Sequence, residues 1–251
     1  MNIGAQLYTL RDLLKEERQI RQSLAKVAKI GFRSVQVSGL GPIEPKTLRS
    51  ICDDLGLSII ITHTPEARII HETERVIEEH TILGANYIGL GAMSQQYRSA
   101  EGAAEFIKAF HKAARKISDA GKLFMYHNHN FEFEKFGGKL LFDYLTEGFA
   151  PGEMGFTLDT YWVQAGGGDV CQWIEKLSGR IPCIHLKDMT IRDGKQIMAP
   201  VMEGNMNFPA ILKALERAGT EYAFIEQDTC EEDPFICLEK SYANLKKLGY
   251  Q

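Results

Sequence analysis

A short stretch in the middle of the chain combines an apolar run with several side chains that can do chemistry. Residues 122–136 read KLFMYHNHNFEFEKF, so the apolar segment is followed by His127, His129 and Glu132. Imidazoles and carboxylates are costly to bury without partners, and such a cluster after an apolar strand is typical of a strand that opens into a cleft. The alternative is a loop whose histidines face solvent. The cleft is favoured because three later predicted strands end in the same way.

The later strand ends supply carboxylates, a further histidine and a lysine. Asp159 ends the segment GFTLD, His185 lies in PCIHL with Lys187 shortly after it, and Glu226 ends AFIE. Three carboxylates and a histidine that converge on one point repel one another unless a cation lies among them. We therefore predict a divalent-metal site formed by Glu132, Asp159, His185 and Glu226. Oxygen-rich ligation with one imidazole favours Mn²⁺, and Mg²⁺, Co²⁺ and Zn²⁺ are alternatives.

Such a site predicts proton transfer beside a carbonyl group. A metal with open coordination positions binds a carbonyl and a neighbouring hydroxyl side by side and stabilises an enediolate while a carboxylate moves the proton. We expect Glu132 and Glu226 to act as the acid and base, with His129 and Lys187 as further catalytic residues. The residues expected to contact the substrate are Tyr8, His63, His127, Trp162, Asp188 and Glu203.

Simpler structural roles compete with several of these assignments. A strand-end aspartate such as Asp159 often caps the following helix. His63 also fits a hydrogen-bonded histidine on the rim, and Lys187 with Asp188 fits a surface ion pair. Three histidines lie among charged residues of predicted helices, and for these we expect solvent-exposed positions: His71, His80 and His111.

The elements that would position these side chains alternate regularly between strand and helix. Apolar runs predict strands at residues 3–10, 34–37, 57–62, 87–90, 123–126, 155–159, 182–186 and 223–226. Helical periodicity predicts helices near residues 16–30, 45–55, 65–83, 100–120, 140–146, 169–177, 208–218 and 234–248, with a long polar connection at 187–207. Eight such units predict one (β/α)₈ TIM barrel domain over residues 1–251. The rival doubly wound sheet lacks its glycine-rich turn after the first strand.

Composition narrows the partners and the compartment. The formal charge of −4 arises from 29 basic and 33 acidic residues without a basic block, which argues against nucleic acid as the main partner. No apolar stretch approaches the roughly 18 residues needed to cross a bilayer. Five scattered cysteines without a CxxC pair indicate reduced thiols. We expect a cytoplasmic protein that binds a small sugar or polyol, neither nucleic acid nor membrane; the sequence leaves open whether it forms a homo-oligomer.

Several motifs resemble the sugar phosphate isomerase/epimerase family of xylose isomerase-like TIM barrels over nearly the whole chain. They are QLYTLRD at 6–12, YHNHNFEF at 126–133, LDTYWVQAGGGD at 158–169, GRIPCIHLKDM at 179–189, MEGNMNFPAIL at 202–212 and IEQD at 225–228. The resemblance implies a divalent metal, with Asp159, His185 and Glu226 at the ligand positions of the motifs. Some relatives carry the fifth-strand glutamate where Tyr126 stands, so His129 is an alternative to Glu132 as ligand, or serves as a base.

Three other functions are alternatives to this one. Apurinic endonucleases of the same superfamily use three zinc ions and carry a histidine where Trp162 stands, so that site cannot be assembled here. A metal-dependent lyase or dehydratase would use the same enolate chemistry on a keto-sugar, an oxidised glycoside or an inosose-like polyol. A non-catalytic sugar-binding barrel would bind no metal tightly, because fold alone does not establish activity.

Overall fold

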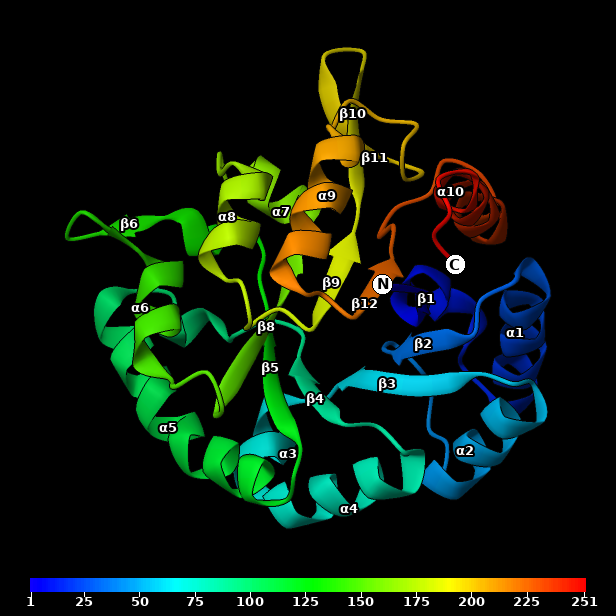
Figure 1. The fold of residues 1–251 in the computed structure, drawn as a ribbon. Coiled ribbons are helices and arrows are strands. Elements are labelled where there is room, and N and C mark those ends of the chain that lie inside the picture. Colours follow the sequence, from blue (N-terminus) through cyan, green and yellow to red (C-terminus); the bar gives the residue numbers. More distant parts are fainter.

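The computed structural model describes residues 1–251 and contains a closed barrel of parallel strands surrounded by helices (Figure 1). The strand order around the ring is β1-β12-β9-β8-β5-β4-β3-β2, and β1 pairs with both β12 and β2 to close it. The barrel strands are β1 (Asn2–Gln6), β2 (Ser34–Val37), β3 (Ser58–His63), β4 (Tyr87–Leu90), β5 (Leu123–His127), β8 (Met154–Asp159), β9 (Cys183–Leu186) and β12 (Tyr222–Ile225). The predicted TIM barrel is therefore confirmed.

The helices form the outer layer and turn their apolar faces toward the strands. They are α1 (Glu17–Ile30), α2 (Pro45–Asp54), α3 (Glu66–His71), α4 (Thr73–Leu83), α5 (Ala100–Asp119), α6 (Leu141–Gly148), α7 (Thr160–Ala165), α8 (Val170–Lys176), α9 (Phe208–Ala218) and α10 (Pro234–Lys247). In α5, Phe106, Phe110 and Ile117 are buried on one face, and Ser99 caps the start of the helix. None of the helices has both the length and the apolar character of a membrane-crossing segment.

Two elements differ in extent from the sequence prediction. The first strand stops at Gln6 rather than at residue 10, because the Gln6 side chain accepts the Tyr8 N–H at 3.2 Å and a 3₁₀ helix, Leu7–Leu13, begins there. The helix predicted at 65–83 is divided into α3 and α4 at Glu72, whose φ of −125° and ψ of 31° are not helical. These differences do not change the order of the strands around the barrel.

The connection predicted at 187–207 contains an antiparallel hairpin. Strands β10 (Asp188–Arg192) and β11 (Lys195–Ala199) pair across a turn at Asp193 and Gly194, which have φ values of 50° and 73°. Such Asp-Gly turns favour hairpins because both residues adopt positive φ readily. In Figure 1 this hairpin projects beyond the ring of helices. A second short hairpin pairs β6 (Lys135–Phe136) with β7 (Lys139–Leu140).

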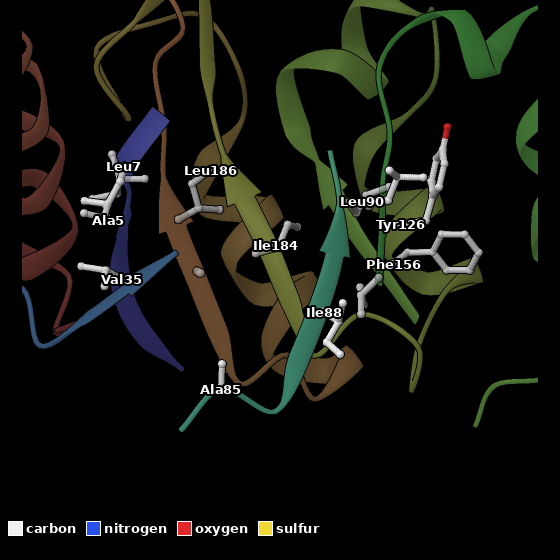
Figure 2. Close-up of a cluster of buried hydrophobic side chains, with 14 of the residues drawn as sticks. Ala5, Leu7, Val35, Ala85, Ile88, Leu90, Tyr126, Phe156, Ile184 and Leu186 are labelled. Atoms are coloured by element: carbon white, nitrogen blue, oxygen red, sulfur yellow. The ribbon is translucent and has the colours of Figure 1, made fainter. Parts of the chain in front are cut away.

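Alternation along the strands divides the core into two parts. Outward-facing strand residues join the helices in a cluster of 57 buried residues; Figure 2 shows part of it, with Ile184 and Leu186 on β9 and Ile88 and Leu90 on β4. Inward-facing residues form a separate small cluster inside the barrel: Ile61, Met125, Cys183 and Phe224. A side chain at Gly4 would meet the Phe224 ring at 2.6 Å, so this inner cluster requires a glycine on β1.

Candidate metal centre

The polar residues of the site lie one layer above the apolar cluster inside the barrel. Side chains alternate along a strand, so residues two positions apart face the same side. Two positions after each member of the inner cluster come His63, His127, His185 and Glu226. Asp159 pairs with His185 on the neighbouring strand. Alternation therefore places these side chains inside the barrel at the carboxyl ends of the strands, where TIM barrels carry their active sites.

Four of these side chains converge. His127, Asp159, His185 and Glu226 are all buried, and one donor atom from each lies within 4.8 Å of the others. Nε2 of His127 is 3.1 Å from Oδ2 of Asp159, and Nδ1 of His185 is 2.9 Å from Oε2 of Glu226. Nδ1 of His185 is also 3.5 Å from Oδ2 of Asp159. The distances fit a shared ion between two imidazoles and two carboxylates.

The two imidazoles are held in the orientation that metal ligands require. Nδ1 of His127 donates to the carbonyl oxygen of Gly91 at 2.7 Å, which leaves Nε2 facing Asp159. Nε2 of His185 lies 2.7 Å from Oε1 of Gln36, which accepts its hydrogen, so Nδ1 faces Glu226. Metal-bound histidines commonly donate their second N–H to a carbonyl, amide or carboxylate in this way. The orientation of the two imidazoles, and not only the identity of the four donor residues, therefore fits a metal site.

The electrostatics also favour a positive charge at the centre. Burial opposes ionisation of Asp159 and Glu226, but Lys187 and the histidines outweigh it and lower the pKa of both carboxyls. Burial likewise opposes protonation of His185, yet Glu226 and Asp159 raise its pKa. Burial and His185 lower the pKa of His127, which favours its neutral form. The carboxylates therefore favour positive charge beside Nδ1 of His185, where a divalent cation would bind. Nδ1 of His185 and Oε2 of Glu226 are both buried without a hydrogen-bond partner, as expected for atoms that would bind a metal.

Lys187 is fully enclosed beside these carboxylates. Its side chain is 2% exposed, and Nζ lies 3.1 Å from Oδ2 of Asp159, 2.9 Å from Oε2 of Glu226 and 3.0 Å from Oδ2 of Asp228. Burial opposes the charge, but the three carboxylates raise the pKa of Lys187. The surface ion pair with Asp188 is not formed.

Glu132 lies outside the converging group, although the sequence predicted it as a ligand. Oε1 accepts from the Tyr126 hydroxyl at 2.6 Å and Oε2 accepts from the His129 backbone N–H at 2.8 Å. Burial raises the pKa of Glu132 to about 7. Strand β5 ends at His127, and the 3₁₀ helix Phe131–Phe133 carries Glu132 behind the strand, against the outward-facing Tyr126. His127, expected to contact substrate, is the β5 residue that joins the group.

A cavity of about 400 Å³ opens above the centre. Its lining residues are Tyr8, Arg11, Ser38, His63, Gly91, Ala92, His127, His129, Lys187, Glu226, Asp228 and Thr229. The cavity therefore brings together six of the residues that the sequence suggested for the site: Tyr8, His63, His127, His129, Lys187 and Glu226. Arg11, Ser38 and Asp228 were not predicted as site residues, although Asp228 lies shortly after Ile225, the last residue of β12. A larger hollow of about 510 Å³, at the opposite end of the barrel beside Ser34 and Tyr222, contains none of the four donors.

Burial favours the neutral form of two further histidines of the cavity. Nδ1 of His63 is 3.1 Å from Oγ of Ser38, and its buried Nε2 has no hydrogen-bond partner. Burial lowers the pKa of His63 well below its ordinary value. Burial also lowers the pKa of His129 to about 3, and its ring is stacked on Phe131 and lies 5.3 Å from the Trp162 ring. Trp162 thus supports His129 and does not itself line the cavity.

Asp188 and Glu203 have positions outside the cavity. The buried Asp188 carboxylate accepts four backbone N–H groups, from Met189, Met202, Gly204 and Met206. These bonds fix the loop that follows the β10–β11 hairpin. Glu203 lies in a hollow beside the hairpin and accepts from Asn244 at 3.4 Å. Asp188 and Glu203 therefore contact the hairpin and the loop beside it, and neither side chain lines the cavity.

One prediction about the helix histidines was wrong. His80 is 3% exposed, with Nε2 at 2.7 Å from the Thr62 hydroxyl and Nδ1 at 2.7 Å from the Val76 carbonyl. It belongs to the buried stripe of α4 together with Val76 and Leu83. His71 is exposed, and His111 is half-buried at 3.1 Å from Glu153.

Asp159 shows that two roles can coincide. Its Oδ1 accepts the Trp162 N–H at 3.1 Å and caps α7, while Oδ2 faces His127, His185 and Lys187. The helix cap fixes one oxygen and thereby orients the other toward the centre.

The fold and the site define a TIM barrel with a candidate metal centre at the carboxyl ends of its strands. Comparison with known families identifies the family within this class. The model of the xylose isomerase-like TIM barrel family matches residues 24–235, and the chain belongs to that family. No curated protein matches the chain significantly.

Solved structures agree with this assignment. A sugar phosphate isomerase/epimerase from Parabacteroides distasonis is 25% identical, with a TM-score of 0.80 over 98% of this chain and 93% of that one. Two structures that are 14% identical share the fold, each with a TM-score of 0.74 over 98% of this chain. They are a D-allulose 3-epimerase from Methylomonas sp., covered over 97%, and the probable 3-DHS dehydratase involved in petrobactin synthesis from Bacillus anthracis, covered over 99%.

Proposed function

We propose that the protein is a divalent-metal-dependent sugar isomerase or epimerase that moves a proton at a carbon next to a carbonyl group. The observation that carries the proposal is the convergence of two oriented imidazoles and two ionised carboxylates at the floor of a cavity. Most of the residues that line the cavity are polar, which suits a ligand rich in hydroxyl groups. The 25% identical structure is named a sugar phosphate isomerase/epimerase, in agreement with this chemistry.

His127, Asp159, His185 and Glu226 would hold the cation. A divalent cation bound there supplies Lewis-acid stabilisation of negative charge on neighbouring substrate oxygens. Two imidazoles with two carboxylates suit Mn²⁺, Co²⁺ or Zn²⁺ better than Mg²⁺, which prefers oxygen ligands and water. We keep Mn²⁺ as the first choice.

The chain's own residues would move the proton. Glu226 borders the cavity and is ionised, so it can take a proton from the carbon beside the carbonyl. His63 and His129 present neutral imidazoles to the same space, where they can form hydrogen bonds with the substrate's hydroxyl groups. The carboxyl group of Glu226 would return the proton that it takes to the neighbouring carbon or oxygen. The ammonium of Lys187 would orient and polarise the carbonyl oxygen. Glu132, without access to the cavity, would position His129 through its backbone N–H.

Two measurements test this function. Protein stripped with a chelator and then dialysed against Mn²⁺ should retain about one ion per chain, and Asp159→Ala and His185→Ala should lose it. Ketoses incubated with the loaded protein in deuterated water should gain deuterium at a carbon beside the carbonyl. Metal retention equal in wild type and both variants would end the proposal, and so would the absence of exchange across a panel of ketoses and inososes.

A lyase or dehydratase is the second candidate. One fold neighbour is named a probable dehydratase, and the enclosed ammonium of Lys187 beside the cavity could donate a hydrogen bond to a departing hydroxyl and stabilise its developing negative charge. The same deuterium experiment separates the two reactions. Release of water or of an aglycone from a keto-sugar, an oxidised glycoside or an inosose would favour the lyase, whereas exchange without such loss favours the isomerase or epimerase.

A further inference from the structure

The position of Lys187 raises the question of how an ammonium and a divalent cation share one site. Nζ contacts Oδ2 of Asp159 at 3.1 Å and Oε2 of Glu226 at 2.9 Å. These are the same two oxygens that face the imidazole nitrogens of the candidate metal centre. A divalent cation bound to Oδ2 of Asp159 and Oε2 of Glu226 would share both oxygen atoms with the ammonium of Lys187. The cation would therefore lie within a few ångströms of Nζ. Like charges at that separation repel strongly in a buried site.

Asp228 offers the ammonium a second partner that the metal does not need. Both of its oxygens are within hydrogen-bonding distance of Nζ, at 3.1 Å and 3.0 Å. Asp228 is not a member of the converging donor group, and its side chain is 23% exposed toward the cavity mouth. The ammonium can therefore give up Asp159 and Glu226 and keep two hydrogen bonds to Asp228.

The charges of the cluster fit occupation by both cations together. Asp159, Glu226 and Asp228 carry three negative charges, and Lys187 compensates one of them. The remaining two negative charges equal the charge of one divalent ion. The charge of Lys187 alone would not need three carboxylates to balance it. The metal alone would be balanced by Asp159 and Glu226, without Lys187 or Asp228.

We infer that Lys187 and the metal compete for Asp159 and Glu226, and that Asp228 is a positioning residue that receives the ammonium when the metal binds. In that position the ammonium would border the cavity, and Asp159 and Glu226 would be free to hold the metal. This inference rests on the metal site of the proposed function and goes beyond it, because it assigns Asp228 a role and links the position of Lys187 to metal loading.

A double-mutant cycle on Mn²⁺ affinity tests the inference. Calorimetric titration of chelator-stripped protein with MnCl₂ compares wild type, Lys187→Met, Asp228→Asn and the double variant. Lys187→Met removes the competitor and should bind Mn²⁺ at least about tenfold more tightly. Asp228→Asn should weaken binding about fivefold or more in the wild-type background, and less than about twofold when Lys187 is already Met. Equal weakening in both backgrounds would mean that Asp228 acts by its charge alone and would overturn its positioning role.

Controls separate this inference from general charge effects and from the proposed function. Lys195→Met and Asp193→Asn change exposed charges of the β10–β11 hairpin and should leave the Mn²⁺ affinity unchanged. If Lys187→Met does not yield folded protein, as judged by circular dichroism, Lys187→Gln takes its place in the cycle. Wild-type binding with no gain in the lysine variant would refute the competition and leave the metal site intact. Absence of binding in every variant would refute the metal site itself.

Discussion

Gln36 provides a sharp test of the metal centre, because it touches a ligand without being one. Its Oε1 accepts the Nε2–H of His185 at 2.7 Å, and both side chains are completely buried. Gln36→Leu removes that acceptor while keeping a side chain of similar size. His185 then loses the contact that fixes its orientation and raises the basicity of Nδ1.

The expected magnitude follows from the burial of the bond. A buried N–H left without an acceptor costs about 1–3 kcal/mol of stability. Loss of such a supporting contact lowers metal affinity about 10- to 100-fold, equivalent to about 1.4–2.8 kcal/mol. Gln36→Glu supplies an ionised acceptor in the same place and should restore binding. Mn²⁺ titration by calorimetry measures the affinity, and urea unfolding measures the stability.

Gln6 is the matched control. It is equally buried, it pairs with Gln36 across strands β1 and β2, and its Oε1 accepts only from the Tyr8 N–H. Gln6→Leu should lower stability by a comparable amount and leave the Mn²⁺ affinity within about twofold of wild type. If both leucine variants bind Mn²⁺ equally well, the orientation argument for His185 is incorrect.

Two more predictions concern stability. Burial lowers the pKa of His80 from 6.5 to about 4 in the folded protein, so the unfolded chain binds the proton more readily. The free energy of unfolding should therefore fall between pH 6.5 and pH 4, by about 3 kcal/mol for this residue. Urea unfolding at several pH values should show that His80→Gln lacks this part of the pH dependence, and the same pH dependence in the variant and wild type would contradict the prediction. Asp188→Ala leaves four backbone N–H groups without their acceptor and should cost about 2–4 kcal/mol, with faster proteolysis of the loop at 202–206. Asp193→Asn in the exposed turn keeps a residue that tolerates positive φ and should be nearly neutral.

The barrel was predictable because each strand carries its own signal and the units repeat. The same alternation could have identified His127 as the fifth-strand donor, since it lies two positions after Met125 and therefore faces the barrel interior. The clustering of His127, His129 and Glu132 in sequence was misleading, because a turn after β5 sends Glu132 behind the strand. His80 was similarly predictable from the spacing of Val76 and Leu83 on α4.

Other features depend on closure of the ring and are invisible in sequence. The three carboxylates around Lys187 come from the ends of β8 and β12, on either side of β9, and only the strand order makes them neighbours. The acceptor of His185 comes from β2, 149 residues earlier in the chain. No spacing rule connects such partners before the topology is known.

The four donors and the two acceptors that orient their imidazoles come from different halves of the chain. His127, Asp159, His185 and Glu226 belong to β5, β8, β9 and the end of β12, whereas Gln36 and Gly91 belong to the first four βα units. A fragment that begins at β5 would thus contain all four candidate ligands but lack Gln36 and Gly91, the hydrogen-bond acceptors that orient the imidazoles. Reassembly of two separately expressed halves should therefore restore ion binding, with the amino-terminal half acting as a template that contributes geometry but no ligand.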